Sequence, residues 1–198
     1  MRELVGARIV TPGDWTDLDL EPSTRHRSIA AAVRRAVASN PGLARSSARL
    51  ISLLDDVARR AYDGGGFFCS SLVLSSDDGP LAANVLMQLC ETGVVGRPTG
   101  SVDDVCAGLA AEVTCDPGWA DADVSVVVLG SVGPAVRVVV VAGGVCVQYL
   151  VPVPESSEYV VLTFTSPSAP YAAAFVELFD SMAASFALDY DIAPAPNE

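Results

Sequence analysis

The 198-residue sequence contains no lysine, so all 12 of its basic side chains are arginine, and it contains a single histidine, His26. The lack of lysine accompanies abundant Ala, Gly, Pro, Asp and Val, a composition typical of a GC-rich bacterial genome. The arginines are therefore weak evidence for anion recognition by themselves, although arginine is the better bidentate ligand.

The near absence of histidine limits the catalytic chemistry that we expect. A Ser-His-Asp triad would have to use His26, which lies between two arginines at a predicted helix start, and no G-x-S-x-G motif occurs. The glycines of residues 63–68 follow a helix and precede a strand, the reverse of the order in a phosphate-binding loop. The carboxylates of residues 115–123 lack the spacing of an EF-hand calcium loop. We therefore expect no catalytic residues, no cofactor and no enzyme activity.

Cysteine clusters are also lacking, and none of the five cysteines forms a C-x-x-C pair. A zinc site needs clustered cysteines or several histidines, so we expect no metal. The odd number and the apolar surroundings favour free, buried thiols in a reducing compartment. The five are Cys69, Cys90, Cys106, Cys115 and Cys146.

Long apolar runs are absent as well. A membrane helix needs about 20 unbroken apolar residues, and the longest run, residues 123–154, is interrupted at Gly133, Arg137 and Gly143. Residues 1–15 contain neither a long apolar signal segment nor a lipobox cysteine. We expect a cytoplasmic protein without membrane contacts.

The remaining pattern predicts one α+β domain over residues 1–198. Spacings of three and four between apolar residues predict two helices, over about 24–39 and 43–62, joined as an αα-hairpin, and a last helix over about 168–188. A capped helix is predicted from Ser101 to about Thr114. We expect residues 1–13 and 189–198 to be mobile.

Alternating and β-branched segments between these helices predict a mainly antiparallel sheet of about six strands, packed by the αα-hairpin and by the C-terminal helix. The segments lie at residues 15–20, 67–76, 81–90, three times within 123–153, and at 158–167. The Asp77-Asp78-Gly79-Pro80 turn would join the second and third of them.

The end of the chain carries a resemblance to a known family. A strand of the form V-L-T-F, at Val161–Phe164, is followed after a short loop by a helix that ends near Ser185-Phe186. This arrangement resembles the PsbP-like α/β/α sandwich, in layout over residues 15–188 and in motif over about the last 30 residues of that span. The superfamily includes the oxygen-evolving-complex subunit, a Ran-binding nuclear import factor and mycobacterial lipoproteins. The resemblance implies a binding or assembly factor, and it carries over no catalytic residue.

Charge is unevenly distributed along the chain. Residues 25–60 contain eight arginines and two aspartates, a net charge of +6, whereas residues 61–198 contain two arginines and 17 acidic residues, a net charge of −15. In one interpretation the arginines of the hairpin pair with acids of the body. In the other they dock an acidic protein partner or a second copy of the chain. The candidate docking residues are Arg25, Arg27, Arg34, Arg35, Arg45 and Arg49.

Nucleic acid is a less suitable partner. The chain as a whole carries a net charge of −12 and has a pI of about 4.3, so its field opposes phosphate binding. The basic segment has no interleaved aromatics to stack on bases.

A small-molecule or lipid carrier is the alternative function. It would use an apolar pocket between the sheet and the last helix, lined by Phe175, Phe179, Met182 and Phe186. Side chains of this kind at this spacing more often form plain core.

Overall fold

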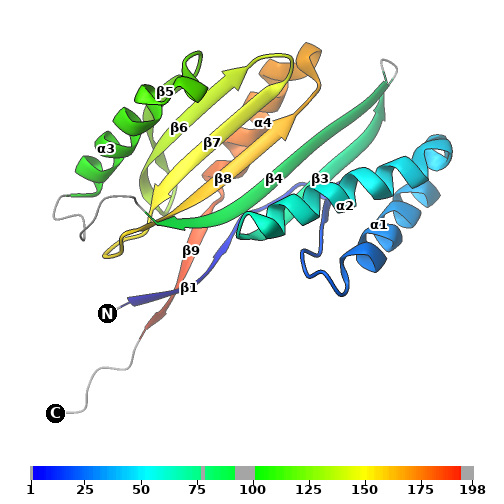
Figure 1. Ribbon diagram of the computed structural model, residues 1–198, viewed down its shortest axis with the longest axis horizontal. Coiled ribbons are helices and arrows are strands. Elements are labelled where there is room, and N and C mark those ends of the chain that lie inside the picture. The colour runs from blue at the N-terminus through cyan, green and yellow to red at the C-terminus, as the bar shows by residue number, and fades with distance from the viewer. Residues whose placement is uncertain (1, 77–78, 92–100, 193–198) are drawn as a thin grey trace.

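The computed structural model describes residues 2–76, 79–91 and 101–192 (Figure 1). Asp77 and Asp78 of the predicted turn therefore lie outside the described residues. The longer helices are α1 (Arg25–Ser39), α2 (Ser47–Asp63), α3 (Val102–Cys115) and α4 (Ala172–Ala184). The strands are β1 (Arg2–Arg8), β2 (Trp15–Asp17), β3 (Gly66–Ser76), β4 (Gly79–Glu91), β5 (Asp123–Leu129), β6 (Gly133–Val141), β7 (Val145–Pro152), β8 (Glu158–Ser166) and β9 (Ala187–Ile192).

Seven strands form one sheet in the order β2-β3-β4-β8-β7-β6-β5, and each neighbouring pair is antiparallel. The hairpins β3–β4, β5–β6 and β6–β7 account for most of this order, because strands joined by tight turns must run antiparallel. The predicted α+β class with a mainly antiparallel sheet is confirmed, and the main sheet contains all seven of the candidate strand segments instead of about six.

The sheet has helices on both faces because its strands alternate two sets of apolar side chains. Val85 and Met87 of β4 face α4 and pack with its Phe179, whereas Leu86 between them packs under α2. On that second face α1 and α2 cover the β3 side, and α3 covers β5, β6 and β7 through Cys106 and its neighbours. Figure 1 shows α4 behind the strands and α2 and α3 in front of them.

The two ends of the described chain pair with each other. Strand β1 is antiparallel to β9 in a separate two-stranded ribbon, with Arg8 opposite Ala187. Leu4 and Leu188 of this ribbon pack against the α4 side of the core. The predicted mobility of residues 1–13 and 189–198 stays a prediction, and residues 193–198 lie outside the described residues.

Two helix boundaries also differ from the sequence prediction. The last helix ends at Ala184, before the predicted Leu188, because Ser185 and Phe186 turn the chain into β9. The second predicted helix is divided into η1, a 3-10 helix (Pro41–Ser46), and α2. Proline at the first position and the Asn40 side chain, which accepts from the Gly42 amide at 3.2 Å, explain why η1 starts there.

Candidate docking surface on the helical hairpin

The αα-hairpin is fixed to the β3 side of the sheet by a small apolar core. Ile29 and Val33 of α1 meet Ala58 and Ala61 of α2, and Cys69 of β3 completes the contact. Small alanines on α2 let the helices and the strand approach closely. The hairpin therefore presents its polar side chains from a rigid base.

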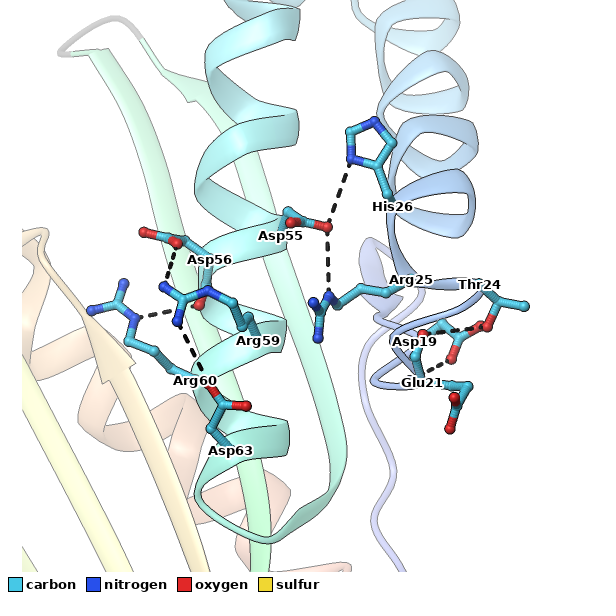
Figure 2. A network of polar contacts seen from close by, with 10 residues as sticks. All are labelled: Asp19, Glu21, Thr24, Arg25, His26, Asp55, Asp56, Arg59, Arg60 and Asp63. Atoms are coloured by element: carbon cyan, nitrogen blue, oxygen red, sulfur yellow. Dashed lines mark hydrogen bonds and ion pairs between the residues drawn. The ribbon is translucent and has the colours of Figure 1, made fainter.

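At the base of the hairpin, the side chains of Arg25 and His26 of α1 reach toward one carboxylate of α2 (Figure 2). The Nε atom of Arg25 lies 3.6 Å from Oδ1 of Asp55, and Nδ1 of His26 lies 3.7 Å from the same oxygen. The side chain of Arg25 is only 13% exposed, whereas that of His26 is 75% exposed. The Arg25 side chain thus points inward, because Asp55 holds the guanidinium group between the helices. A docking residue was expected to point outward.

Further along α2, arginines pair with acids of the same helix. Arg59 contacts Asp56 at 2.8 Å and Asp63 at 3.5 Å, and the Arg60 Nε donates to the Asp56 carbonyl at 3.3 Å (Figure 2). The hydrogen bond from Arg59 lowers the pKa of Asp56. At this end of the hairpin the arginines are therefore paired within the fold, in line with the first interpretation of the charge pattern.

The other end of the hairpin is different. Here α1 leads through η1 into α2, and residues 28–54 contain four arginines and no Asp or Glu, a net charge of +4. All four side chains are exposed, and none has an ion pair or hydrogen bond with any residue that the structure describes. We call these four residues the basic tip: Arg34, Arg35, Arg45 and Arg49.

Arg27 takes an intermediate position. It is exposed on the first turns of α1, and its charge helps to lower the pKa of Asp19, after the larger effects of hydrogen bonds from Thr24 and from the Glu21 amide. The Thr24 hydroxyl donates to Asp19 at 2.6 Å and so ties the start of α1 to the preceding loop. Arg27 therefore belongs to the exposed surface but has an acid near it.

A cleft of about 270 Å³ lies beside the basic tip, between α1, η1 and the β2–β3 edge of the sheet. Arg35 and Asn40 line its polar side, Leu43 and Val73 line its apolar side, and Asp14 contributes one carboxylate. A smaller cavity of about 50 Å³ shares Leu43 and Val73 in its lining and is also lined by Leu50, Leu54 and Ser71. Sequence reasoning missed this cleft because its walls are separated by tens of residues, and no local pattern marks Asp14, Asn40 or Val73.

The residues of the carrier alternative lie in the core. Phe175, Phe179, Met182 and Phe186 are each buried, and Phe179 stacks on Phe164 of β8 with 5.1 Å between ring centroids. These contacts fill the space in which the carrier alternative places its ligand. The carrier function stays a prediction without a supporting observation.

The cysteines differ in exposure. Cys69 and Cys106 are buried, Cys90 and Cys146 are half-buried, and Cys115 is exposed, so the expectation that all are buried fails at Cys115, which ends α3. Burial raises the pKa of Cys69 to about 12, so its thiol is a poor nucleophile. Over the residues that the structure places, no three His, Cys, Asp or Glu side chains gather as a metal site would require.

Comparison with known proteins gives a structural likeness but no match in sequence. No family model and no curated protein matches the sequence. A solved structure of LpqN, described as involved in cell envelope biogenesis of Mycobacterium tuberculosis, is similar with a TM-score of 0.44 and 9% identity over 92% of this chain and 82% of that one. Within the described ranges, no helix has both the length and the apolar character needed to cross a bilayer.

Proposed function

We propose that this chain is a non-catalytic protein-interaction or assembly factor, which docks an acidic protein partner through the basic tip. The observation that carries the proposal is the set of four exposed arginines that form no ion pair with any described residue, in a chain of net charge −12. Membership of the PsbP-like superfamily, a cytoplasmic location and the absence of catalysis belong to the same proposal.

The contrast between the two ends of the hairpin supports this function. At the base, Arg25 and Arg59 have carboxylates within 3.6 Å and 2.8 Å. At the tip, neither Arg34 nor Arg35 has a carboxylate within ion-pair distance in the described structure. Unpaired charges on a rigid element give orientation and fast association with a partner of opposite sign, more than they give affinity.

The experiment compares two double variants with the same change in net charge. Arg34→Gln with Arg35→Gln removes two positive charges from the basic tip, and Ala107→Glu with Ala111→Glu adds two negative charges on the exposed side of α3. Each protein is immobilised and used to capture partners from its own cell extract at about 0.05 M and about 0.5 M salt.

We expect the wild type and the α3 variant to retain the same acidic protein at low salt and to lose it at high salt. The tip variant should retain none of it at either salt, with an unchanged melting temperature. Retention of the same protein in equal amount by the tip variant would overturn the proposal. Size-exclusion chromatography with light scattering distinguishes a partner protein from a second copy of this chain.

A further inference from the structure

Strand β3 extends beyond its outer neighbour. Its 11 residues run from Gly66 to Ser76, whereas β2 has three residues and pairs only with Ser70–Leu72. Figure 1 shows the β3–β4 hairpin reaching past the rest of the sheet, beside the end of the helical hairpin where α1 and α2 are joined. The shared lining of the cleft by Leu43 and Val73 agrees with this view. The outer edge of β3 is therefore open next to the basic tip.

The backbone groups on this open edge can be assigned from the ladder. The Leu18 amide donates to the Cys69 carbonyl at 2.8 Å, so Cys69 directs its backbone groups toward the β2 side. In an antiparallel ladder such groups recur at every second residue, which assigns Ser71, Val73 and Ser75 to the same side. Ser71 lies opposite Thr16 of β2, but Val73 and Ser75 have no strand partner on this side within the described chain. An edge of this kind is a template for one more strand.

The cleft and the charge indicate what kind of strand fits. Val73 and Arg35 both line the cleft, so a residue that pairs with Val73 in an antiparallel added strand directs its side chain toward Arg35. The basic tip makes the surroundings of the cleft positive, and Asp14 contributes the one carboxylate in the lining of the cleft. Carboxylate side chains on the hairpin-facing side of the added strand therefore match the site in charge.

We propose that the partner binds as an extended acidic segment that adds a strand antiparallel to β3 along Val73 and Ser75, with its carboxylates directed toward Arg35 and the rest of the basic tip. This inference rests on the proposed function and specifies the chemistry of the partner. Main-chain hydrogen bonds would supply affinity, and the alternation of side chains would supply specificity.

The probe is an acetylated, amidated hexapeptide of alternating glutamate and valine, titrated into the ¹⁵N-labelled full chain. We expect shift changes and slowed hydrogen exchange at the amides of Val73 and Ser75. A hexapeptide in which lysine replaces glutamate is the charge control and should not bind, because the basic tip repels it.

Two N-methylated hexapeptides test the backbone contact without altering the protein. In the proposed register the glutamates pair with Val73 and Ser75 and direct their N–H groups to β3, so N-methylation of the glutamates should weaken binding at least about fivefold. N-methylation of the valines changes groups that face away from β3, and affinity should stay within about twofold.

Two variant pairs test the protein side. Val73→Pro removes the outward N–H group, which an edge position tolerates, and Val73→Thr keeps that group with a side chain of similar shape. The first should weaken hexapeptide binding at least about fivefold and the second should not. Arg34→Gln with Arg35→Gln should also weaken it at least about fivefold. If Val73→Pro does not fold, the N-methylated hexapeptides carry the same test.

The outcomes separate the inference from the proposed function. If partner capture depends on the basic tip but the hexapeptide leaves the amides of Val73 and Ser75 unchanged at about millimolar concentration, strand addition is overturned and the docking function stands. Equal affinity for the glutamate-methylated and unmethylated hexapeptides would overturn strand addition as well. If the hexapeptide binds at β3 but the tip variant still captures the partner, the proposed function is wrong.

Discussion

One aspartate of α4, Asp180, forms polar contacts with two strands of the sheet. Arg137 of β6 and Tyr149 of β7 lie opposite each other in register, and both reach Asp180 of α4. The Nε and Nη2 atoms of Arg137 donate to the two carboxylate oxygens at 2.9 Å each, and the Tyr149 hydroxyl donates to one of them. Burial and the neighbouring Asp180 carboxylate raise the pKa of Tyr149, so its hydroxyl stays a donor at neutral pH. This contact orients the aromatic side of α4 on the sheet.

Replacement of Asp180 should therefore lower the free energy of unfolding more than the partial exposure of its side chain suggests. In Asp180→Ala the hydroxyl of Tyr149, a residue that is 1% exposed, loses its acceptor, and we expect a loss of about 1–3 kcal/mol in the free energy of unfolding. Glu177→Ala, at an exposed position of the same helix, should change it by less than about 0.5 kcal/mol. Urea unfolding followed by circular dichroism measures both. Equal changes in Asp180→Ala and Glu177→Ala would mean that the contact between Asp180 and Tyr149 does not contribute to stability.

The thiols differ at the residue scale in a way that labelling can detect. We expect a disulfide reagent at about pH 8 to label Cys115 first, because it is exposed, and Cys69 last, because burial raises its pKa to about 12. Mass spectrometry of peptides from partly labelled protein gives the order. Cys115→Ser should remove the fastest phase and leave the slowest one unchanged. Early labelling of Cys69 in folded protein would contradict the burial.

At the scale of elements, the base of the hairpin depends on a pair that is partly shielded from water. Asp55 is 32% exposed and faces Arg25, whereas Asp56 is more exposed and faces Arg59 on the surface of α2. Exposed ion pairs contribute about 0–1 kcal/mol. Loss of one member of a shielded pair costs more, because the remaining charge stays out of water without a counter-charge. The two adjacent aspartates of α2 should thus differ in their effect on stability.

We expect Asp55→Ala to lower the free energy of unfolding by about 2 kcal/mol, and Asp56→Ala by less than about 1 kcal/mol. The two substitutions remove the same group from neighbouring positions of one helix, so helix propensity cancels in the comparison. Thermal unfolding with a fixed buffer measures the difference. If Asp56→Ala lowered the free energy of unfolding more than Asp55→Ala, the shielded pair of Arg25 and Asp55 would not be the more stabilising of the two.

Most elements of this fold were predictable because their signals are local. Apolar residues at spacings of three and four predicted α1 and α2, and β-branched runs predicted β5, β6, β7 and β8. Strands β1 and β9 were missed because each is stabilised by pairing with a segment about 180 residues away, as Arg8 with Ala187. The alternation of Leu188 and Tyr190 with Asp189 and Asp191 was a usable strand signal, but Leu188 also extends the apolar spacing of α4.

The candidate site was predictable in charge but not in geometry. The distribution of charge along the sequence placed the arginines on the hairpin. The local sequence does not predict that Arg25 turns inward to Asp55 while Arg35 stays exposed. That division depends on how α1 packs on α2. The cleft and the open edge at Val73 depend on still more distant contacts, because β2 pairs with β3 only from Trp15, after a turn that the Trp15 amide closes on the Pro12 carbonyl.

At the scale of the whole molecule, two electrostatic effects of opposite sign act on an acidic ligand. The net charge of −12 repels it, and the basic tip with its local charge of +4 attracts it. The Debye length is about 30 Å at 0.01 M salt and about 10 Å at 0.1 M. Distant acidic residues are therefore screened first, whereas the arginines close to the ligand are screened only at higher salt.

The affinity for the glutamate–valine hexapeptide should therefore pass through a maximum as salt is raised. We expect it to rise between about 0.01 M and about 0.1 M as repulsion by the body is screened, and to fall at least about threefold toward 0.5 M as attraction by the basic tip is screened. The titration of amide shifts, repeated at five or so salt concentrations, measures this curve. In Arg34→Gln with Arg35→Gln the falling part should flatten while the rising part remains, because only the local attraction has been reduced. A steady rise over the whole range in the wild type would mean that the net charge dominates and that the basic tip does not attract acidic ligands.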